Sequence, residues 1–151
     1  MISITKVVEW DMGHRVPQHV NKCKNPHGHR YRLEASIAGD VCQDSSSAEH
    51  GMVKDFYEVK QILRKKIHDV LDHNFMIYEG DALMHAFFSS EEAKDLAVTI
   101  VPFIPTVENI VMWCYTQLRD EFPPQMRIHK LRLYETPTSW ADYWPDTNHV
   151  N

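Results

Sequence analysis

The segment His29–Gly39 constrains the fold most strongly, because apolar and polar side chains alternate along it. A period of two is typical of a β-strand that buries one face and exposes the other. Strands of this kind occur in antiparallel sheets that are covered on one side. The face that we expect to be buried carries Tyr31, Leu33, Ala35 and Ile37.

Three further strands and two long helices are predicted around this segment. The order is β-β-α-α-β-β, which indicates an α+β fold with a four-stranded antiparallel sheet and both helices on one face. Apolar residues at helical spacing indicate the first helix. The second helix is expected to begin with Thr106 as its N-cap and to end at Pro123–Pro124. The strands are Ile2–Trp10, His29–Gly39, Arg127–Glu135 and Trp140–Trp144, and the first helix is about Tyr57–Leu71.

The pattern between Asn74 and Ile104 is weaker. Ser89-x-x-Glu92 resembles a capping box, which predicts the start of a short helix. Val98–Ile104 is apolar enough for a short strand. Because the segment is longer than a minimal connection, we expect it to alter the mouth of a pocket or to form contacts between subunits.

Composition narrows the class of protein. With 151 residues, 43% of them hydrophobic and 25% charged, we expect a single domain over 1–151. The net charge of −5 argues against a general nucleic-acid partner. Leu96–Ile104 is too short to span a membrane, and Met1–Trp10 lacks a signal-peptide layout. Three cysteines at irregular spacing do not make a disulfide framework, so we expect a cytoplasmic protein.

The chain contains 10 histidines, and two of them begin the alternating strand. His27 and His29 are separated by Gly28, so both imidazoles point to the same face of an extended chain. His14, at the other side of the loop, is the first candidate for a third ligand, and His19 is the second. Three imidazoles favour zinc and leave its fourth position open for catalysis. The alternative is that these are ordinary loop histidines.

Cys23 lies in a stretch, Met12–Leu33, that has five basic residues and no Asp or Glu. Positive surroundings and a nearby metal favour the thiolate, which can act as a base or a nucleophile. The alternative is a fourth zinc ligand that closes a structural site. We also expect part of the stretch to attract an anionic substrate, namely Lys22, Lys24, Arg30 and Arg32.

Three carboxylates are further candidates. Asp72 precedes His73 and can orient its imidazole for proton transfer, although His at a helix end is also favourable by itself. Glu135 shares a strand face with apolar residues, so it needs a partner, either a protein cation or a ligand with two parallel N–H groups. Glu108 lies near a helix N-terminus, where the helix dipole alone explains it.

Together these segments resemble, in order along the chain, the 6-pyruvoyl-tetrahydropterin synthase superfamily. The three-residue gap between Cys23 and His27 is similar to the bacterial 6-carboxy-5,6,7,8-tetrahydropterin synthase branch of queuosine and deazaguanine biosynthesis. The resemblance spans nearly the whole chain. Its motifs are His14, Cys23-x₃-His27-Gly28-His29, Gly51-Met52-Val53-x-Asp55-Phe56, Leu71-Asp72-His73, Pro105-Thr106-x-Glu108-Asn109 and Glu135-Thr136.

The resemblance implies a tunnelling fold, which assembles by sheet continuation into a homo-oligomeric barrel with active sites at subunit boundaries. It implies that 7,8-dihydroneopterin triphosphate and water become 6-carboxytetrahydropterin, acetaldehyde and triphosphate. A pyruvoyl-type synthase is the alternative enzyme, and a non-catalytic zinc protein is the third hypothesis. The implied roles are zinc binding by His14, His27 and His29, catalysis by Cys23, Asp72 and His73, and substrate binding by Glu135, Glu108 and Thr106.

Overall fold

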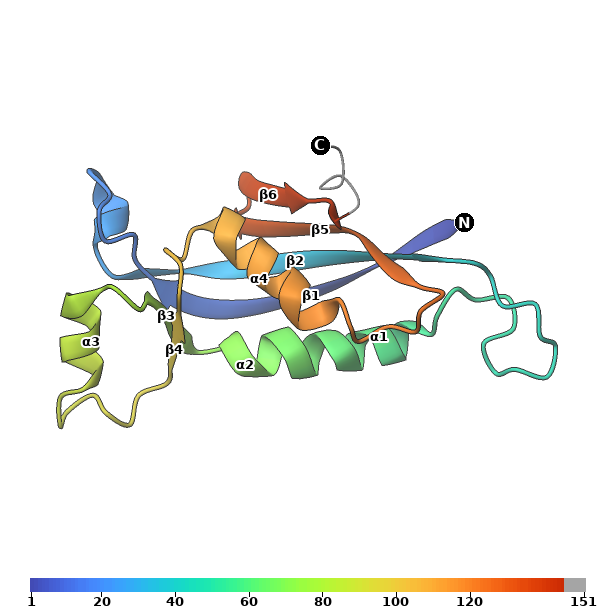
Figure 1. Ribbon diagram of the computed structural model, residues 1–151, viewed down its shortest axis with the longest axis horizontal. Helices are drawn as coiled ribbons and strands as arrows, with labels where there is room; N and C mark the ends of the chain where they lie inside the picture. The colour runs from blue at the N-terminus through green and yellow to red at the C-terminus, as the bar shows by residue number, and fades with distance from the viewer. Residues whose placement is uncertain (146–151) are drawn as a thin grey trace.

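The computed structural model describes residues 1–145, which form a six-stranded mixed sheet with helices packed against it (Figure 1). The strand order is β4-β3-β1-β2-β5-β6. The strands are β1 (Ile2–His14), β2 (His27–Gly39), β3 (Asn74–Tyr78), β4 (Val98–Val101), β5 (Arg127–Thr136) and β6 (Ser139–Tyr143).

The antiparallel pair β1 and β2 is the longest ladder of the sheet. Each strand has 13 residues, and the register runs from Ile2 opposite Gly39 to His14 opposite His27. Successive side chains alternate between the faces, so one face of β2 buries the residues expected from its pattern. Tyr31, Leu33, Ala35 and Ile37 are each 0% exposed.

Two helical runs cover the apolar face of the sheet. The first comprises α1 (Phe56–Leu63), a π-helical turn η2 (Arg64–His68) and α2 (Asp69–Leu71), and the second is α4 (Val107–Leu118). Full burial of a large apolar side chain contributes about 1.5–3 kcal/mol, so this shared core holds the helices to the sheet. Its fully buried helical members include Val59, Leu63, Ile67, Ile110, Cys114 and Leu118.

The α+β class and the position of both helices on one face are confirmed, whereas the four-stranded, wholly antiparallel sheet is wrong. β3 pairs parallel with β1, and β4 pairs parallel with β3. β1 continues past Trp10 to His14, which leaves an outer edge at Met12–His14 for β3. Parallel pairing needs a long crossover connection, and the first helical run lies within it.

The segment between β3 and β4 contains α3 (Ala82–Phe88). The capping-box prediction at Ser89 is wrong, because Ser89 is the C-cap of α3. The side chain of Asp81 caps the other end by accepting a hydrogen bond from the Met84 N–H. The short strand is confirmed as Val98–Val101.

The strand predicted at Trp140–Trp144 is confirmed as β6, Ser139–Tyr143. Residues 146–151 lie outside the described residues, so the single domain over 1–151 stays a prediction. Within residues 1–145, no helix has the length and apolar character needed to cross a membrane.

Candidate metal centre

Three histidines meet at the end of the β1–β2 ladder. His14 is opposite His27 in the register, and His29 lies two residues further along β2 on the same face. One nitrogen from each ring can be chosen so that all three lie within 4.8 Å of one another. The ring centroids are 4.6 Å apart for His14 and His27, 5.2 Å for His14 and His29, and 4.9 Å for His27 and His29. The predicted trio is therefore brought together, and His19 is not part of this group.

Backbone carbonyls orient two of the three imidazoles. His14 Nδ1 is 2.6 Å from the Pro105 carbonyl oxygen, and His27 Nδ1 is 2.7 Å from the Asn25 carbonyl oxygen. A carbonyl can only accept, so each Nδ1 carries the proton. A neutral ring then has its lone pair at Nε2, where a metal can bind, and this type of contact fixes the orientation of metal-binding histidines.

Burial keeps the rings of His14 and His29 neutral. Loss of hydration lowers the pKa of His14 to about 4. The pKa of His29 is lowered for the same reason, although the nearby Glu135 carboxylate opposes the shift. Because neutral imidazole is the ligand form, neither ring has to lose a proton to bind a cation at pH 7.

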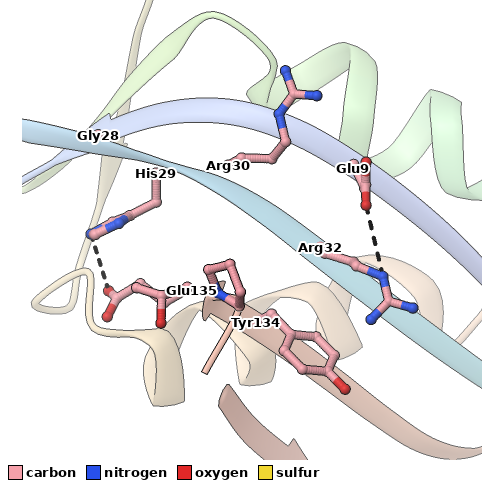
Figure 2. Close-up of a pocket in the computed structure, with 9 residues that line it drawn as sticks. Glu9, Gly28, His29, Arg30, Arg32, Tyr134 and Glu135 are labelled. Carbon is pink, nitrogen blue, oxygen red and sulfur yellow. Dashed lines mark ion pairs between the residues drawn. The ribbon is translucent and has the colours of Figure 1, made fainter. Parts of the chain in front are cut away.

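A cation fits the remaining polar atoms of this centre. His14 Nε2 is buried without a hydrogen-bond partner. Glu135 Oε1 lies 3.6 Å from this atom and 3.9 Å from His29 Nε2, and Figure 2 shows the carboxylate facing His29. The lone pair of His14 Nε2 and the carboxylate oxygen repel each other unless a proton or a cation lies between them. The three nitrogen donors suit a divalent metal ion such as zinc.

Glu135 is at the junction of this centre and a pocket of about 520 Å³ (Figure 2). Its neighbours Leu131 and Leu133 are fully buried, whereas its own side chain is 25% exposed. Within residues 1–145, the basic side chains that face its carboxylate are those of His14 and His29. The pocket is lined by Glu9, Gly28, His29, Arg30, Arg32, Tyr134, Glu135, Thr136 and Pro137.

Asp72 and His73 form the expected carboxylate–imidazole pair. His73 Nδ1 is 2.9 Å from Asp72 Oδ2, and Asp72 Oδ1 accepts a hydrogen bond from the Asp11 N–H. This backbone hydrogen bond is the main reason why the pKa of Asp72 is lowered. His73 has a φ of 57° and a side chain that is 81% exposed. The His73 N–H donates a hydrogen bond to the Asp11 carbonyl oxygen, and His73 and His29 line the same hollow.

Cys23 lies outside the group of three histidines. It is exposed on a short 3₁₀ turn, η1 (Lys22–Lys24), in the blue loop that projects beyond the paired ends of β1 and β2 (Figure 1). The group of potential metal ligands found within residues 1–145 does not include its thiol. Its predicted catalytic role therefore stays a prediction.

The basic stretch around Cys23 offers less free charge than its sequence indicates. Arg30 forms two hydrogen bonds with the Asp11 carboxylate, and Arg32 lies 2.7 Å from Glu34. Lys22 and Lys24 flank Cys23, and all three residues line a separate hollow. These two lysines are therefore better candidates than the two arginines for attracting an anion.

The two remaining predicted residues begin α4. Thr106 is the N-cap, and its hydroxyl accepts a hydrogen bond from the Asn109 N–H, as expected. Glu108 is exposed in the first turn, where the helix dipole favours it. Neither side chain lines the pocket at Glu135.

Sequence reasoning missed several groups that support the site. The carbonyl oxygens of Asn25 and Pro105 have no signal in the sequence, because every residue has a carbonyl. Tyr31 is a core residue, as its strand pattern predicts, and its ring also lies 6.0 Å from that of His14 and 5.8 Å from that of His29, between centroids. Burial raises the pKa of its hydroxyl, which has no hydrogen-bond partner.

Comparison with known proteins identifies the family of this chain. The family model described as 6-pyruvoyl tetrahydropterin synthase matches residues 3–146, so the chain belongs to this family. A curated relative from Haemophilus influenzae, 6-carboxy-5,6,7,8-tetrahydropterin synthase, is 34% identical over 143 residues, which cover 95% of this chain and 99% of the relative. The protein of the same name from Aquifex aeolicus is 32% identical, with 93% and 96% covered.

Solved structures show the same fold. The uncharacterized protein WS1659 from Wolinella succinogenes has a TM-score of 0.79 at 23% identity, with 95% of this chain and 98% of that chain covered. The Caenorhabditis elegans 6-pyruvoyl tetrahydropterin synthase has a TM-score of 0.66 at 22% identity, with 95% and 94% covered.

Proposed function

We propose that this protein is a zinc-dependent lyase that converts 7,8-dihydroneopterin triphosphate to 6-carboxy-5,6,7,8-tetrahydropterin, acetaldehyde and triphosphate. The three-histidine centre, with its buried and unpartnered His14 Nε2, is the observation that carries the proposal. The relatives named 6-carboxy-5,6,7,8-tetrahydropterin synthase support the product, since they match over almost their whole length. Queuosine biosynthesis and a cytoplasmic location remain predictions of the sequence.

In this proposal His14, His27 and His29 hold the zinc ion. A bound zinc ion supplies Lewis-acid chemistry, which stabilises negative charge on substrate oxygens as protons leave carbon. The protein holds the rings ready for it through the Pro105 and Asn25 carbonyls, so the donor nitrogens need little rearrangement.

Acid–base chemistry is assigned to groups on two different segments. Cys23 takes a proton from substrate carbon, and His73 supplies or accepts another, with Asp72 stabilising the charged form of its ring. Glu135 binds the amino-pyrimidine edge of the pterin, because adjacent N–H groups match a carboxylate through two parallel hydrogen bonds. Thr106 and Glu108 complete substrate binding from the start of α4.

We propose a homo-oligomer formed by continuation of the sheet. β1 pairs with β3 only through Met12–His14, so the outer edge from Ile2 to Asp11 has no partner strand within residues 1–145. Exposed backbone edges of this kind favour pairing with another chain. Light scattering on the purified protein tests this assembly, and a monomer at micromolar concentration would contradict it.

Product analysis tests the reaction. The metal-loaded protein is incubated with dihydroneopterin triphosphate, and the pterin and any aldehyde are identified by mass spectrometry. Equal amounts of acetaldehyde and 6-carboxytetrahydropterin are expected. A pyruvoyl product without acetaldehyde would instead support the pyruvoyl-type synthase, which the name of the matching family favours. No turnover by a protein with one bound zinc ion per chain would support the non-catalytic zinc protein.

A further inference from the structure

The carbonyl that orients His14 belongs to a tight turn at the start of α4. The Thr106 N–H donates to the Ile104 carbonyl oxygen over 2.8 Å, which closes a three-residue γ-turn with Pro105 at its centre. Proline restricts φ to a value that suits an inverse γ-turn. The direction of the Pro105 carbonyl therefore depends on whether this turn stays closed.

The Asn109 side chain holds the same turn from the first part of the helix. Its Nδ2 donates a hydrogen bond of 2.9 Å to the Ile104 carbonyl oxygen. The Thr106 hydroxyl already accepts from the Asn109 N–H, so the carboxamide is not needed to cap the helix.

These contacts form a continuous path to the metal centre. Asn109 holds the Ile104 carbonyl, the γ-turn directs the Pro105 carbonyl, and that carbonyl lies 2.6 Å from His14 Nδ1. Pro105 is buried and His14 is 1% exposed, so water has little access to replace the contact. If the turn opens, His14 loses the acceptor that keeps its proton on Nδ1.

We propose that Asn109 is a positioning residue for the metal centre, which acts through the γ-turn to keep the His14 Nε2 lone pair directed at the bound ion. This rests on the metal site of the proposed function. It also links the first turn of α4, where Thr106 and Glu108 lie, to the geometry of the metal ligands.

Nitrogen NMR of the histidine rings in metal-free protein tests whether Asn109 determines which ring nitrogen of His14 carries the proton. Asn109→Ala and Asn109→Asp both remove the donor, and Asp in the first turn of a helix is favourable for folding. In the unmodified protein His14 is expected to carry its proton on Nδ1, and in both variants a substantial fraction should carry it on Nε2. His27 is an internal control, because its acceptor is the local Asn25 carbonyl and should be unaffected.

Cobalt binding tests the consequence for the metal. Loss of an outer-shell partner typically weakens metal binding 10–100-fold, so both variants should bind Co²⁺ about tenfold more weakly, with an altered visible absorption spectrum. Gln117→Glu on the same helix is the matched control and should leave affinity and spectrum unchanged. Thermal unfolding identifies any variant that is not folded, and the other variant then decides.

The two experiments separate the two proposals. An unchanged His14 tautomer and an unchanged cobalt spectrum in a folded Asn109 variant would overturn the role of Asn109. Failure of the unmodified protein to bind Co²⁺ would instead overturn the metal site, while the NMR experiment would still report whether Asn109 orients His14.

Discussion

The three histidines and Cys23 are close in sequence but are held in different ways. The histidines lie on paired strands, and two of their rings donate to backbone carbonyls. Cys23 lies on an exposed 3₁₀ turn outside the sheet. Metal ligands must be fixed to within fractions of an ångström, which a strand ladder provides, whereas a group that moves protons can approach the substrate on a loop.

The largest expected effect is a loss of turnover without a loss of zinc, which would distinguish the Cys23 loop from the three histidines. Cys23→Ala should lower kcat by about 10²–10⁴-fold, as is typical for loss of a general base, while zinc content stays at one ion per chain. Turnover assays and elemental analysis measure the two quantities. Cys42→Ala, which changes a thiol in another loop, should leave both unchanged. Loss of zinc in the Cys23 variant would identify the thiol as a ligand and contradict the open metal site.

Replacement of one histidine of the strand ladder should lower metal binding, in contrast to the replacement of Cys23. His27→Ala should weaken metal binding by more than about 100-fold, because a direct ligand contributes at least as much as an outer-shell partner. His27 is only partly buried, so the fold should persist. Metal analysis of protein without a histidine tag measures the change, with His19→Ala as the control. Equal zinc content in both variants would remove His27 from the site.

Glu135 connects the metal centre to the neighbouring pocket. Glu135→Gln should raise the KM for the pterin substrate about tenfold, because a neutral amide replaces a charge-assisted acceptor. Glu9→Gln changes a carboxylate that lines the same pocket but is paired with Arg32, and it should have little effect. If the Glu135 variant binds substrate normally, the carboxylate does not anchor the pterin.

The smallest effect concerns the stability of the fold, through an ion pair between β5 and β6. Two hydrogen bonds from Arg132 hold the pKa of Asp142 below its ordinary value of 3.8. A lowered folded-state pKa stabilises the protein above pH 3.8, and this contribution is lost as the pH falls through the folded-state value. Asp142→Asn should therefore lower the free energy of unfolding at pH 7 by about 1 kcal/mol.

Urea denaturation at several pH values measures this difference. The gap between the variant and the unmodified protein should shrink as the pH falls below 3.8. Asp120→Asn, which removes an exposed carboxylate, is the control and should change stability little. A gap that is constant with pH would mean that the ion pair does not contribute.

Local patterns were sufficient for much of the fold. The alternation in His29–Gly39 and the Thr106 cap predicted a strand and a helix start that are present. The strand β3 and the parallel pairing of β3 with β1 and β4 were not predicted, because short apolar segments do not indicate their partners. Helical spacing in the sequence predicts a buried stripe of Val59, Leu63, Ile67 and Val70 on the first helix, but Val70 is 42% exposed and Leu71 is buried in its place. The π-helical turn before them shifts the later side chains around the axis.

The sequence by itself determined which groups are available: two imidazoles at a spacing that places them on one face of a strand, a carboxylate on an apolar face, and an Asp–His pair at a helix end. Only the tertiary structure decided that His14 lies opposite His27, that Glu135 faces both rings, and that Pro105 orients His14 from a distant turn. The physical reason is that side-chain direction follows from local backbone geometry, whereas contacts between distant segments depend on strand register and packing.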